Sequence, residues 1–183
     1  GSRHVHTALR PGDVIPIAGP RNHFALEEAA QHSVFIAGGI GITPLLSMMR
    51  RLNELGRPWE LHYAARTRAQ AGFLADVQAL SASGHGRVTV ALDGEPGGVM
   101  LNLAQIVAQA PAHAHLYCCG PTGMLDAFEA ATAGLPPDRV HTEHFAPRQA
   151  ADTAGGFEVR CARAGTNLRV LPGQTLLHAL LAH

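Results

Sequence analysis

The 183-residue sequence has little charge, and the charges it has are balanced. Charged residues make up 15% of the chain, with 14 basic and 14 acidic side chains, so no basic pattern indicates nucleic-acid binding. No apolar run approaches the roughly 18 residues of a membrane span, and no signal-peptide pattern is visible. The cysteines lack the spacing of a disulfide framework: Cys118, Cys119 and Cys161. We therefore expect a cytoplasmic, monomeric globular protein with neither a nucleic-acid nor a membrane partner.

A complete set of metal ligands is also missing, although the chain contains 12 histidines. Several lie two or three residues apart, as do His141 and His144. The segment 141–144 reads His-Thr-Glu-His, which differs from the H-E-x-x-H of zinc proteases. A closed zinc site needs four assembled ligands, so we expect surface and strand-end histidines and no metal site.

What the sequence does contain is a strand, a glycine turn and a helix in succession. Ser33–Ala37 is a short apolar run typical of a buried strand. The following helix is expected to begin at Pro44, with Thr43 as its N-cap, and to end before Gly56 at the C′ position. Between the strand and the helix lies a turn rich in glycine: Gly38, Gly39 and Gly41.

Such a turn is suited to an anion, because free N–H groups and the positive end of a helix converge there. The spacing departs from the dinucleotide fingerprint G-x-G-x-x-G, since Pro44 occupies the third glycine position. From these residues alone, a diphosphate site and a tight turn without a ligand remain equally open.

Further strands and helices alternate along the chain, which predicts right-handed βαβ units and a parallel sheet. Together with the first strand they predict a doubly wound, five-stranded α/β domain. A strand with a proline is expected at 14–20, and a hairpin followed by a short helix at 157–181. The other expected strands are 59–64, 87–92, 114–118 and 139–145, and the helices are 72–82, one capped by Asn102, and 124–133.

Ligands of such sheets bind beyond the carboxyl ends of the strands. Three segments follow strand ends and are therefore candidates for the site: 38–44, 65–68 and 119–123.

These segments resemble the motifs of one family, the flavin- and iron–sulfur-containing reductases of two-component aromatic oxygenases. The type is that of phthalate dioxygenase reductase and vanillate O-demethylase reductase, within the ferredoxin–NADP reductase superfamily. The nucleotide-domain match covers about 20–145. The motifs are 38–44 (Gly-Gly-Ile-Gly-Ile-Thr-Pro), 63–66 (Tyr-Ala-Ala-Arg), 119–124 (Cys-Gly-Pro-Thr-Gly-Met), 141–145 (His-Thr-Glu-His-Phe) and 19–24 (Gly-Pro-Arg-Asn-His-Phe).

The resemblance implies a domain order. Residues 1–20 would be the end of an FMN-binding β-barrel, and 21–146 the pyridine-nucleotide domain with a ferredoxin reductase-like fold. Residues 147–156 would be a linker, and 157–183 the start of a β-grasp 2Fe-2S ferredoxin domain without its cluster cysteines. FMN and the 2Fe-2S cluster are thus expected in the intact protein and not in this chain, which by itself would not reduce acceptors.

The resemblance also implies roles for individual residues around the nicotinamide. The glycine turn with Thr43 and Pro44 would hold the nucleotide diphosphate, and Thr43 would approach the contact between flavin and nicotinamide. Cys119 would lie beside the reacting nicotinamide carbon and position the ring. The alternative for Cys119 is a small buried residue at a strand end. Two further residues would form the second nucleotide-facing turn: Gly120 and Pro121.

Other implied roles concern the flavin and the adenosine. Glu143 and Phe145 match an acidic and aromatic pair that borders the flavin, although Phe145 could equally be an ordinary packing residue. Asn22 and Phe24 could face the flavin from the connector. Arg66 and Arg68 lie where the adenosine ribose is expected, or are simply solvated. The segment after that strand contains these two arginines and no acid, which favours tolerance of NADPH. The resemblance instead favours NADH.

The function that follows is that of an NAD(P)H-dependent oxidoreductase component. Electrons would pass from the nucleotide through FMN and a 2Fe-2S cluster to an oxygenase partner. Two alternatives stay open: a flavin-only reductase of the same superfamily, and a nucleotide-sensing module without redox activity.

Overall fold

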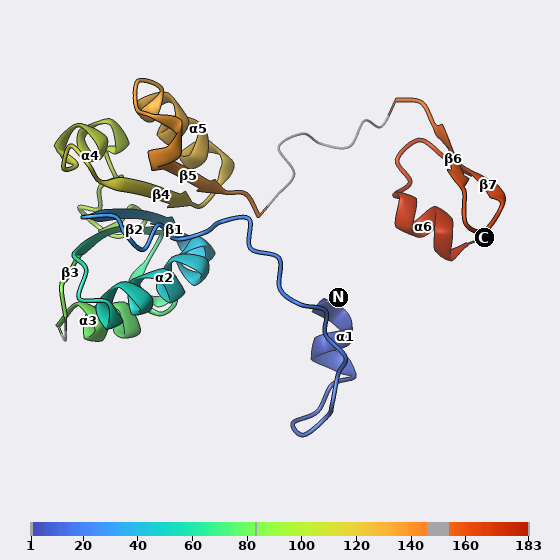
Figure 1. The fold of residues 1–183 in the computed structure, drawn as a ribbon, viewed down its shortest axis with the longest axis horizontal. Coiled ribbons are helices and arrows are strands. Elements are labelled where there is room, and N and C mark those ends of the chain that lie inside the picture. Colours follow the sequence, from blue (N-terminus) through green and yellow to red (C-terminus); the bar gives the residue numbers. More distant parts are fainter. Residues whose placement is uncertain (1, 83, 146–153, 183) are drawn as a thin grey trace.

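The structure of the protein, a computed structural model, describes residues 2–82, 84–145 and 154–182. Its centre is a five-stranded parallel sheet with the order β3-β2-β1-β4-β5, shown in Figure 1. From β1 the chain adds β2 and β3 on one side and then crosses to add β4 and β5 on the other side. The topological switch point, where ligands of such sheets bind, therefore lies between β1 and β4. The strands are β1 (Ser33–Gly38), β2 (Trp59–Ala65), β3 (Gly86–Leu92), β4 (His115–Cys119) and β5 (Val140–Glu143).

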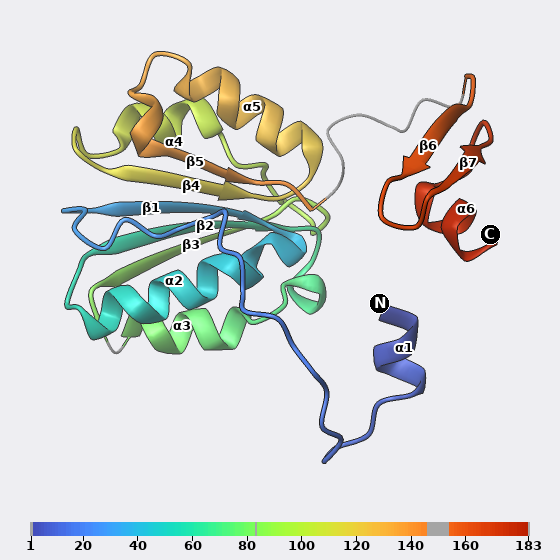
Figure 2. The same cartoon turned by 45° about the vertical axis from the view of Figure 1, so that its right-hand side comes forward.

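Helices cover both faces of the sheet, as the turned view in Figure 2 shows. One face carries α2 (Ile42–Glu54) and α3 (Leu74–Ala82), and the other carries α4 (Leu103–Gln109) and α5 (Thr122–Thr132). Asn102 caps α4, because its side-chain oxygen accepts the N–H of Gln105. The prediction of a doubly wound, five-stranded parallel sheet is thus confirmed.

All six residues of β1 are buried, as expected for a central parallel strand covered on both faces. Their side chains alternate between two cores. Phe35 and Ala37 pack against the α2/α3 side, while Val34 and Ile36 pack against the α4/α5 side. This alternation decides which side chains of the neighbouring strands can reach the site.

The predicted strand at 14–20 is wrong. No strand occurs between residues 2 and 32, where the ordered secondary structure is a single short helix, α1 (Ser2–Thr7). Val14 is 96% exposed and Ile17 82% exposed. Pro16 has no N–H to give to a sheet, and among the described residues no strand runs beside this segment.

The start of α2 also differs from the prediction. The helix begins at Ile42 with Gly41 as N-cap, after a 3-10 turn η1 (Gly39–Gly41). Thr43 is therefore not the N-cap: its hydroxyl donates to the carbonyl oxygen of Ile40 at 2.9 Å instead of accepting an amide proton. The η1 turn advances the helix start by two residues and moves Pro44 from the first position to the third. The end of the helix was predicted correctly, since Gly56 follows it with φ +66°.

The C-terminal residues form the predicted hairpin and helix. β6 (Phe157–Cys161) and β7 (Thr166–Val170) pair antiparallel, and α6 (Leu176–Leu181) is capped by the Thr175 hydroxyl, which accepts the N–H of His178 at 3.2 Å. Most of the predicted linker, 147–156, lies outside the described residues. Across the described ranges, no helix is both long and apolar enough to traverse a bilayer.

Candidate functional site

Two turns meet at the switch point with their backbones in contact. A Cβ atom added to Gly41 would overlap the carbonyl oxygen of Cys119. One added to Gly38 would lie 2.6 Å from Cδ of Pro121, and one added to Gly120 would lie 3.2 Å from the Gly38 backbone. These glycines are therefore required for the close approach of the turn after β1 to the turn after β4.

Helix starts follow both turns. The turn after β1 leads into α2, and Pro121 precedes α5 as its N-cap. The hydroxyl of Tyr63 lies 3.2 Å from the carbonyl oxygen of Gly39 and so helps to fix the first turn. The free N–H groups and positive ends of two helices therefore point to the same edge of the sheet, which favours an anionic ligand.

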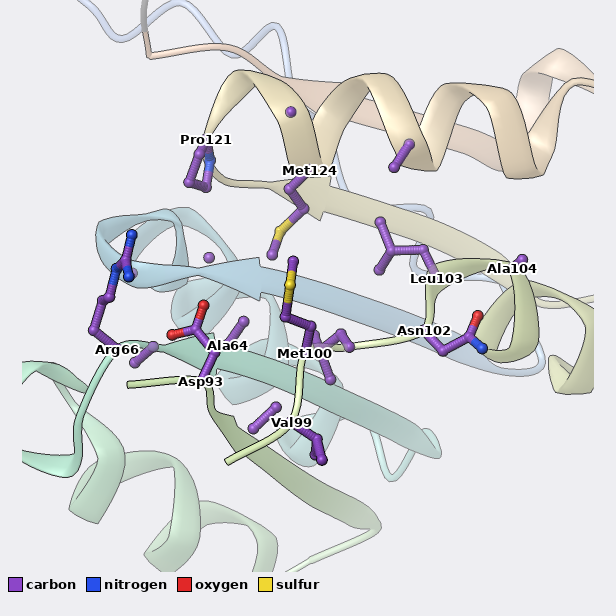
Figure 3. A pocket seen from close by; sticks show the side chains of 17 residues that line it. Ala64, Arg66, Asp93, Val99, Met100, Asn102, Leu103, Ala104, Pro121 and Met124 are labelled. Atoms are coloured by element: carbon purple, nitrogen blue, oxygen red, sulfur yellow. The ribbon is translucent and has the colours of Figure 1, made fainter. Parts of the chain in front are cut away.

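A cavity of about 870 Å³ opens beside these turns, and Figure 3 shows its walls. Its lining is mainly apolar, and the two charged residues on it are Arg66 and Asp93. Four of the predicted site residues lie on its wall: Gly38, Gly39, Arg66 and Pro121.

The alternation of the strands explains why the cavity lies on the α4/α5 side. Tyr63 and Ala65 of β2 belong to the core on the α2/α3 side. Ala64 and the following Arg66 therefore point to the opposite face. The same reasoning places Ala91 and Asp93, at the end of β3, on that face, and all four residues line the cavity.

Asp93 is a site residue that the sequence reasoning missed. No acid directly follows the strand at 59–64, whereas Asp93 directly follows the neighbouring strand. β2 and β3 pair in register up to Ala65 and Leu92, so the next residues along, Arg66 and Asp93, stand side by side. The available signal was the position of Asp93 directly after the expected strand 87–92.

The loop that leads from β3 to α4 supplies a second group of missed residues. Val99 is 67% and Met100 79% exposed, yet both line the cavity. In Figure 3 the side chain of Met100 extends towards that of Met124 from α5. Thioethers adapt their shape to flat apolar groups, so this part of the cavity is suited to a planar ring.

A second cavity, of about 590 Å³, brings together residues from distant parts of the chain. The connector supplies Asn22 and Phe24, the first turn of α2 supplies Pro44, and Glu143 ends β5. The ring of Phe24 is only 6% exposed and packs edge-on against Tyr117 at a centroid distance of 5.9 Å. Four residues predicted to contact the nucleotide or the flavin thus line this cavity, although the Phe24 side chain is mostly buried in the core.

Cys119 lines neither cavity and is fully buried at the end of β4. Burial raises the pKa of its thiol to about 11, and the nearby carboxylate of Glu143 adds to the rise. A neutral thiol is a poor nucleophile. This environment supports a packing or positioning role for Cys119.

Several other predicted residues lie outside both cavities. Thr43 bonds to Ile40, as described above, and Gly41 and Gly120 join the two turns. The backbone N–H of Arg68 donates to the Glu95 carboxylate at 2.7 Å, which ties the end of β2 to the loop after β3. Phe145 is 55% exposed. For the described part of the chain, no group of three or more histidine, cysteine or carboxylate side chains is placed to hold a metal ion.

The fold and the site together define a class: a nucleotide-binding domain of doubly wound α/β type, with its ligand cradle at the switch point. The sequence pattern of the family described as "Oxidoreductase NAD-binding domain" matches residues 35–130. The chain belongs to this family. The resemblance to reductases of the phthalate dioxygenase and vanillate O-demethylase type is also confirmed by similar proteins.

Two curated relatives illustrate this similarity. The phenoxybenzoate dioxygenase subunit beta of Ectopseudomonas oleovorans is 53% identical over 183 residues, covering 100% of this chain and 56% of the relative. The vanillate O-demethylase oxidoreductase of a Pseudomonas species is 39% identical over 184 residues, covering 98% of this chain and 57% of the relative. The chain therefore spans little more than half the length of these relatives.

A solved structure shows the same likeness in three dimensions. Phthalate dioxygenase reductase, described as a modular structure for electron transfer from pyridine nucleotides to [2Fe-2S], superimposes with a TM-score of 0.68. It is 30% identical, and the match covers 89% of this chain and 51% of that one.

Proposed function

We propose that this chain is the pyridine-nucleotide-binding part of a reductase that supplies electrons to an aromatic oxygenase. The observation that carries the proposal is the backbone contact between the two glycine turns at the switch point, beside the 870 Å³ cavity. Similar proteins named as a 3-chlorobenzoate-3,4-dioxygenase reductase subunit and as a vanillate O-demethylase oxidoreductase support the choice of partner. Because the chain spans only part of those relatives, electron transfer belongs to the intact protein.

The two turns fit a dinucleotide diphosphate, since nothing lies within 4 Å of a Cβ added to Gly39 or Gly123, so a ligand could approach the backbone there. The N–H groups at the start of α2 would bind the diphosphate. The adenosine half would occupy the cavity on the α4/α5 side, against Met100 and Met124. A bound nicotinamide supplies a hydride. The neutral, buried Cys119 would support the ring's position indirectly, through the Gly41 turn that its backbone contacts, and would not compete as a nucleophile.

The second cavity is the proposed face for the flavin of the intact protein. Asn22 and Glu143 offer polar groups there, and Pro44 links this cavity to the first turn. Thr43 and Phe145 flank this edge of the chain and would complete the approach to the flavin. In this proposal residues 1–20 continue a flavin barrel and residues 157–183 begin a 2Fe-2S ferredoxin domain. NADH is proposed as the preferred nucleotide.

The direct test is a calorimetric titration of the 183-residue chain with NADH. We expect saturable binding that ADP-ribose competes with. The variant Ala127→Trp fills the cavity from α5, where Ala127 lines the wall, and should weaken binding by at least about tenfold, because the lost contacts amount to more than 1.4 kcal/mol. Ala130→Trp is the matched control, because Ala130 is also exposed on the same helix but does not line the cavity. No binding of NADH or NADPH at millimolar nucleotide would overturn the proposal.

A further inference from the structure

The hydroxyl of Tyr63 lies between two backbone segments at the edge of the sheet. Tyr63 belongs to β2 and is fully buried, with its ring in the core on the α2/α3 side. Its hydroxyl oxygen lies 3.2 Å from the carbonyl oxygen of Gly39 and 3.0 Å from that of Gly72. A tyrosine hydroxyl carries one proton, so the two carbonyls share it. Burial raises the pKa of Tyr63, and the hydroxyl is therefore a neutral donor near pH 7.

Both carbonyls belong to peptide groups beside a residue with a left-handed backbone. Gly39 has φ +53°, and Phe73, which follows Gly72, has φ +58°. Among the residues that the structure describes, Phe73 is the one non-glycine residue with positive φ. Such conformations persist where surrounding contacts hold them. The Tyr63 hydroxyl is a contact of this kind for both peptide groups.

The peptide group between Gly39 and Ile40 is free to turn over unless it is held. Glycine populates the left-handed and mirror-β regions with similar ease, and a rotation between them exchanges the directions of the C=O and N–H groups. Nothing lies within 4 Å of a Cβ added to Gly39, so side-chain packing does not restrain it. The N–H of Ile42 is divided between the carbonyls of Gly39 and Ile40. The Tyr63 hydroxyl is the second contact on the Gly39 carbonyl.

The direction of this carbonyl decides what the turn presents to a ligand. In a trans peptide group the C=O and the following N–H point in opposite directions. Because the Gly39 carbonyl points to Tyr63 in the α2/α3 core, the N–H of Ile40 points away from that core. Ile40 is the second residue of η1, where N–H groups have no partner within the turn. Gly39 lines the cavity of about 870 Å³, so this N–H is available to an anion there, whereas a turned peptide would present a carbonyl oxygen.

We propose that Tyr63 is a positioning residue of the nucleotide site: its hydroxyl holds the Gly39 carbonyl inward, so that the Ile40 N–H donates to the diphosphate. The two hydrogen bonds lie at opposite ends of one peptide group. An anion at the N–H therefore polarises the carbonyl and strengthens its bond to the hydroxyl. The shared proton then moves towards Gly39 and away from Gly72. This inference rests on the proposed function, because it deepens the account of the same diphosphate cradle.

The test compares Tyr63→Phe with the unchanged chain in calorimetric titrations with NADH and ADP-ribose. Phenylalanine keeps the buried ring and removes the hydroxyl. We expect both affinities to fall about three- to tenfold, the range that one hydrogen bond of ordinary strength sustains. Adenosine carries no phosphate, so its affinity, followed by NMR titration, should not change. A role in stability alone would not separate ADP-ribose from adenosine.

Tyr117→Phe is the matched control. The chain has two tyrosines, and Tyr117 is also fully buried. Its hydroxyl accepts the N–H of Glu27 at 2.9 Å, and it lines neither cavity. The control therefore loses a hydrogen bond away from the glycine turns, and it should be destabilised without a change in NADH affinity.

A second measurement observes the peptide group directly. In the unchanged chain, the amide proton resonance of Ile40 should move downfield when ADP-ribose is added, because its N–H then donates to an anion. This shift should be smaller in Tyr63→Phe at saturating ligand. Should Tyr63→Phe fold poorly by circular dichroism, the resonance of the unchanged chain still decides, since an Ile40 amide that ADP-ribose leaves unmoved overturns the inference.

The outcomes separate this inference from the proposed function. If the unchanged chain binds NADH and Tyr63→Phe binds it equally well, the role of Tyr63 is overturned and the nucleotide site stands. The same holds if Tyr63→Phe and Tyr117→Phe lose affinity alike, or if adenosine is weakened as much as ADP-ribose. If the unchanged chain binds neither NADH nor NADPH, both proposals fall.

Discussion

The contact between the two turns predicts a large effect of the substitution Gly41→Ala. Gly41 has φ −60° and ψ −9°, a conformation that alanine adopts without strain. By backbone entropy alone, the change would stabilise the protein by roughly 0.4–1 kcal/mol. The added methyl group would, however, overlap the carbonyl oxygen of Cys119 and lie 3.0 Å from the amide nitrogen of Gly120.

Relief of this overlap requires a shift of backbone against backbone, since neither neighbour is a flexible side chain. Overpacking of this kind costs about 1–3 kcal/mol and occasionally more, and we expect the upper end. For a domain of this size, about 3 kcal/mol corresponds to a fall in Tm of roughly 10 °C. Affinity for NADH should fall at the same time, because separation of the turns distorts the diphosphate cradle.

The assay is thermal and urea unfolding followed by circular dichroism, with NADH calorimetry on the folded variant. Gly134→Ala is the control, because nothing lies within 4 Å of a Cβ added to Gly134 and its φ is not in the positive range. It should be neutral or slightly stabilising. A Gly41→Ala protein as stable as Gly134→Ala, with unchanged NADH affinity, would refute the assignment of the backbone contact as the basis of the site.

Two further predictions follow from buried titratable groups. Burial raises the pKa of the Cys118 thiol to about 12 and that of the Cys119 thiol to about 11. In native protein at pH 8, an aromatic disulfide reagent should therefore react rapidly with the partly exposed Cys161 alone, and in urea it should react with all three thiols. A second fast-reacting thiol in the native protein would contradict this reasoning. Burial, and secondarily His115, lowers the pKa of His141; its neutral form therefore stabilises the fold above about pH 6.5, the unfolded value, and this contribution is lost as the pH falls through the lower folded pKa. The urea midpoint should thus drop between pH 7 and pH 5, and less so in His141→Gln, whereas equal drops in both proteins would rule out His141 as the cause.

The central fold could be predicted because the sequence repeats one local pattern. Short apolar runs alternate with segments of helical periodicity, and right-handed crossover connections then leave a parallel sheet as the simplest arrangement. Strand Ser33–Ala37 shows this well, since its continuous apolar character is what burial on both faces requires. The C-terminal glycine Gly56 and the N-cap Asn102 could also be predicted, because helix capping depends on the residue type at the helix end and on its immediate neighbours.

Details that depend on distant residues could not be predicted. The N-cap at Thr43 was wrong because the tight approach of the turn to β4 imposes an additional 3-10 turn, which no local propensity encodes. The strand predicted at 14–20 had β-branched residues but depends on a neighbouring strand for its hydrogen bonds. Asp93 was missed because its place beside Arg66 follows from the register of β2 and β3, which is a tertiary property.

The backbone contact at Gly41 and Gly120 has a consequence for how such a domain can change. The contact belongs to the first and fourth strands, whereas Arg66, Asp93 and Met100 lie after the second and third. In the proposed function, the diphosphate and the adenosine would thus be held by different parts of one sheet edge. An insertion or replacement in the loop 93–102 would reshape the wall of the cavity while leaving the contact between the two turns intact, so the cavity could be changed without loss of the fold.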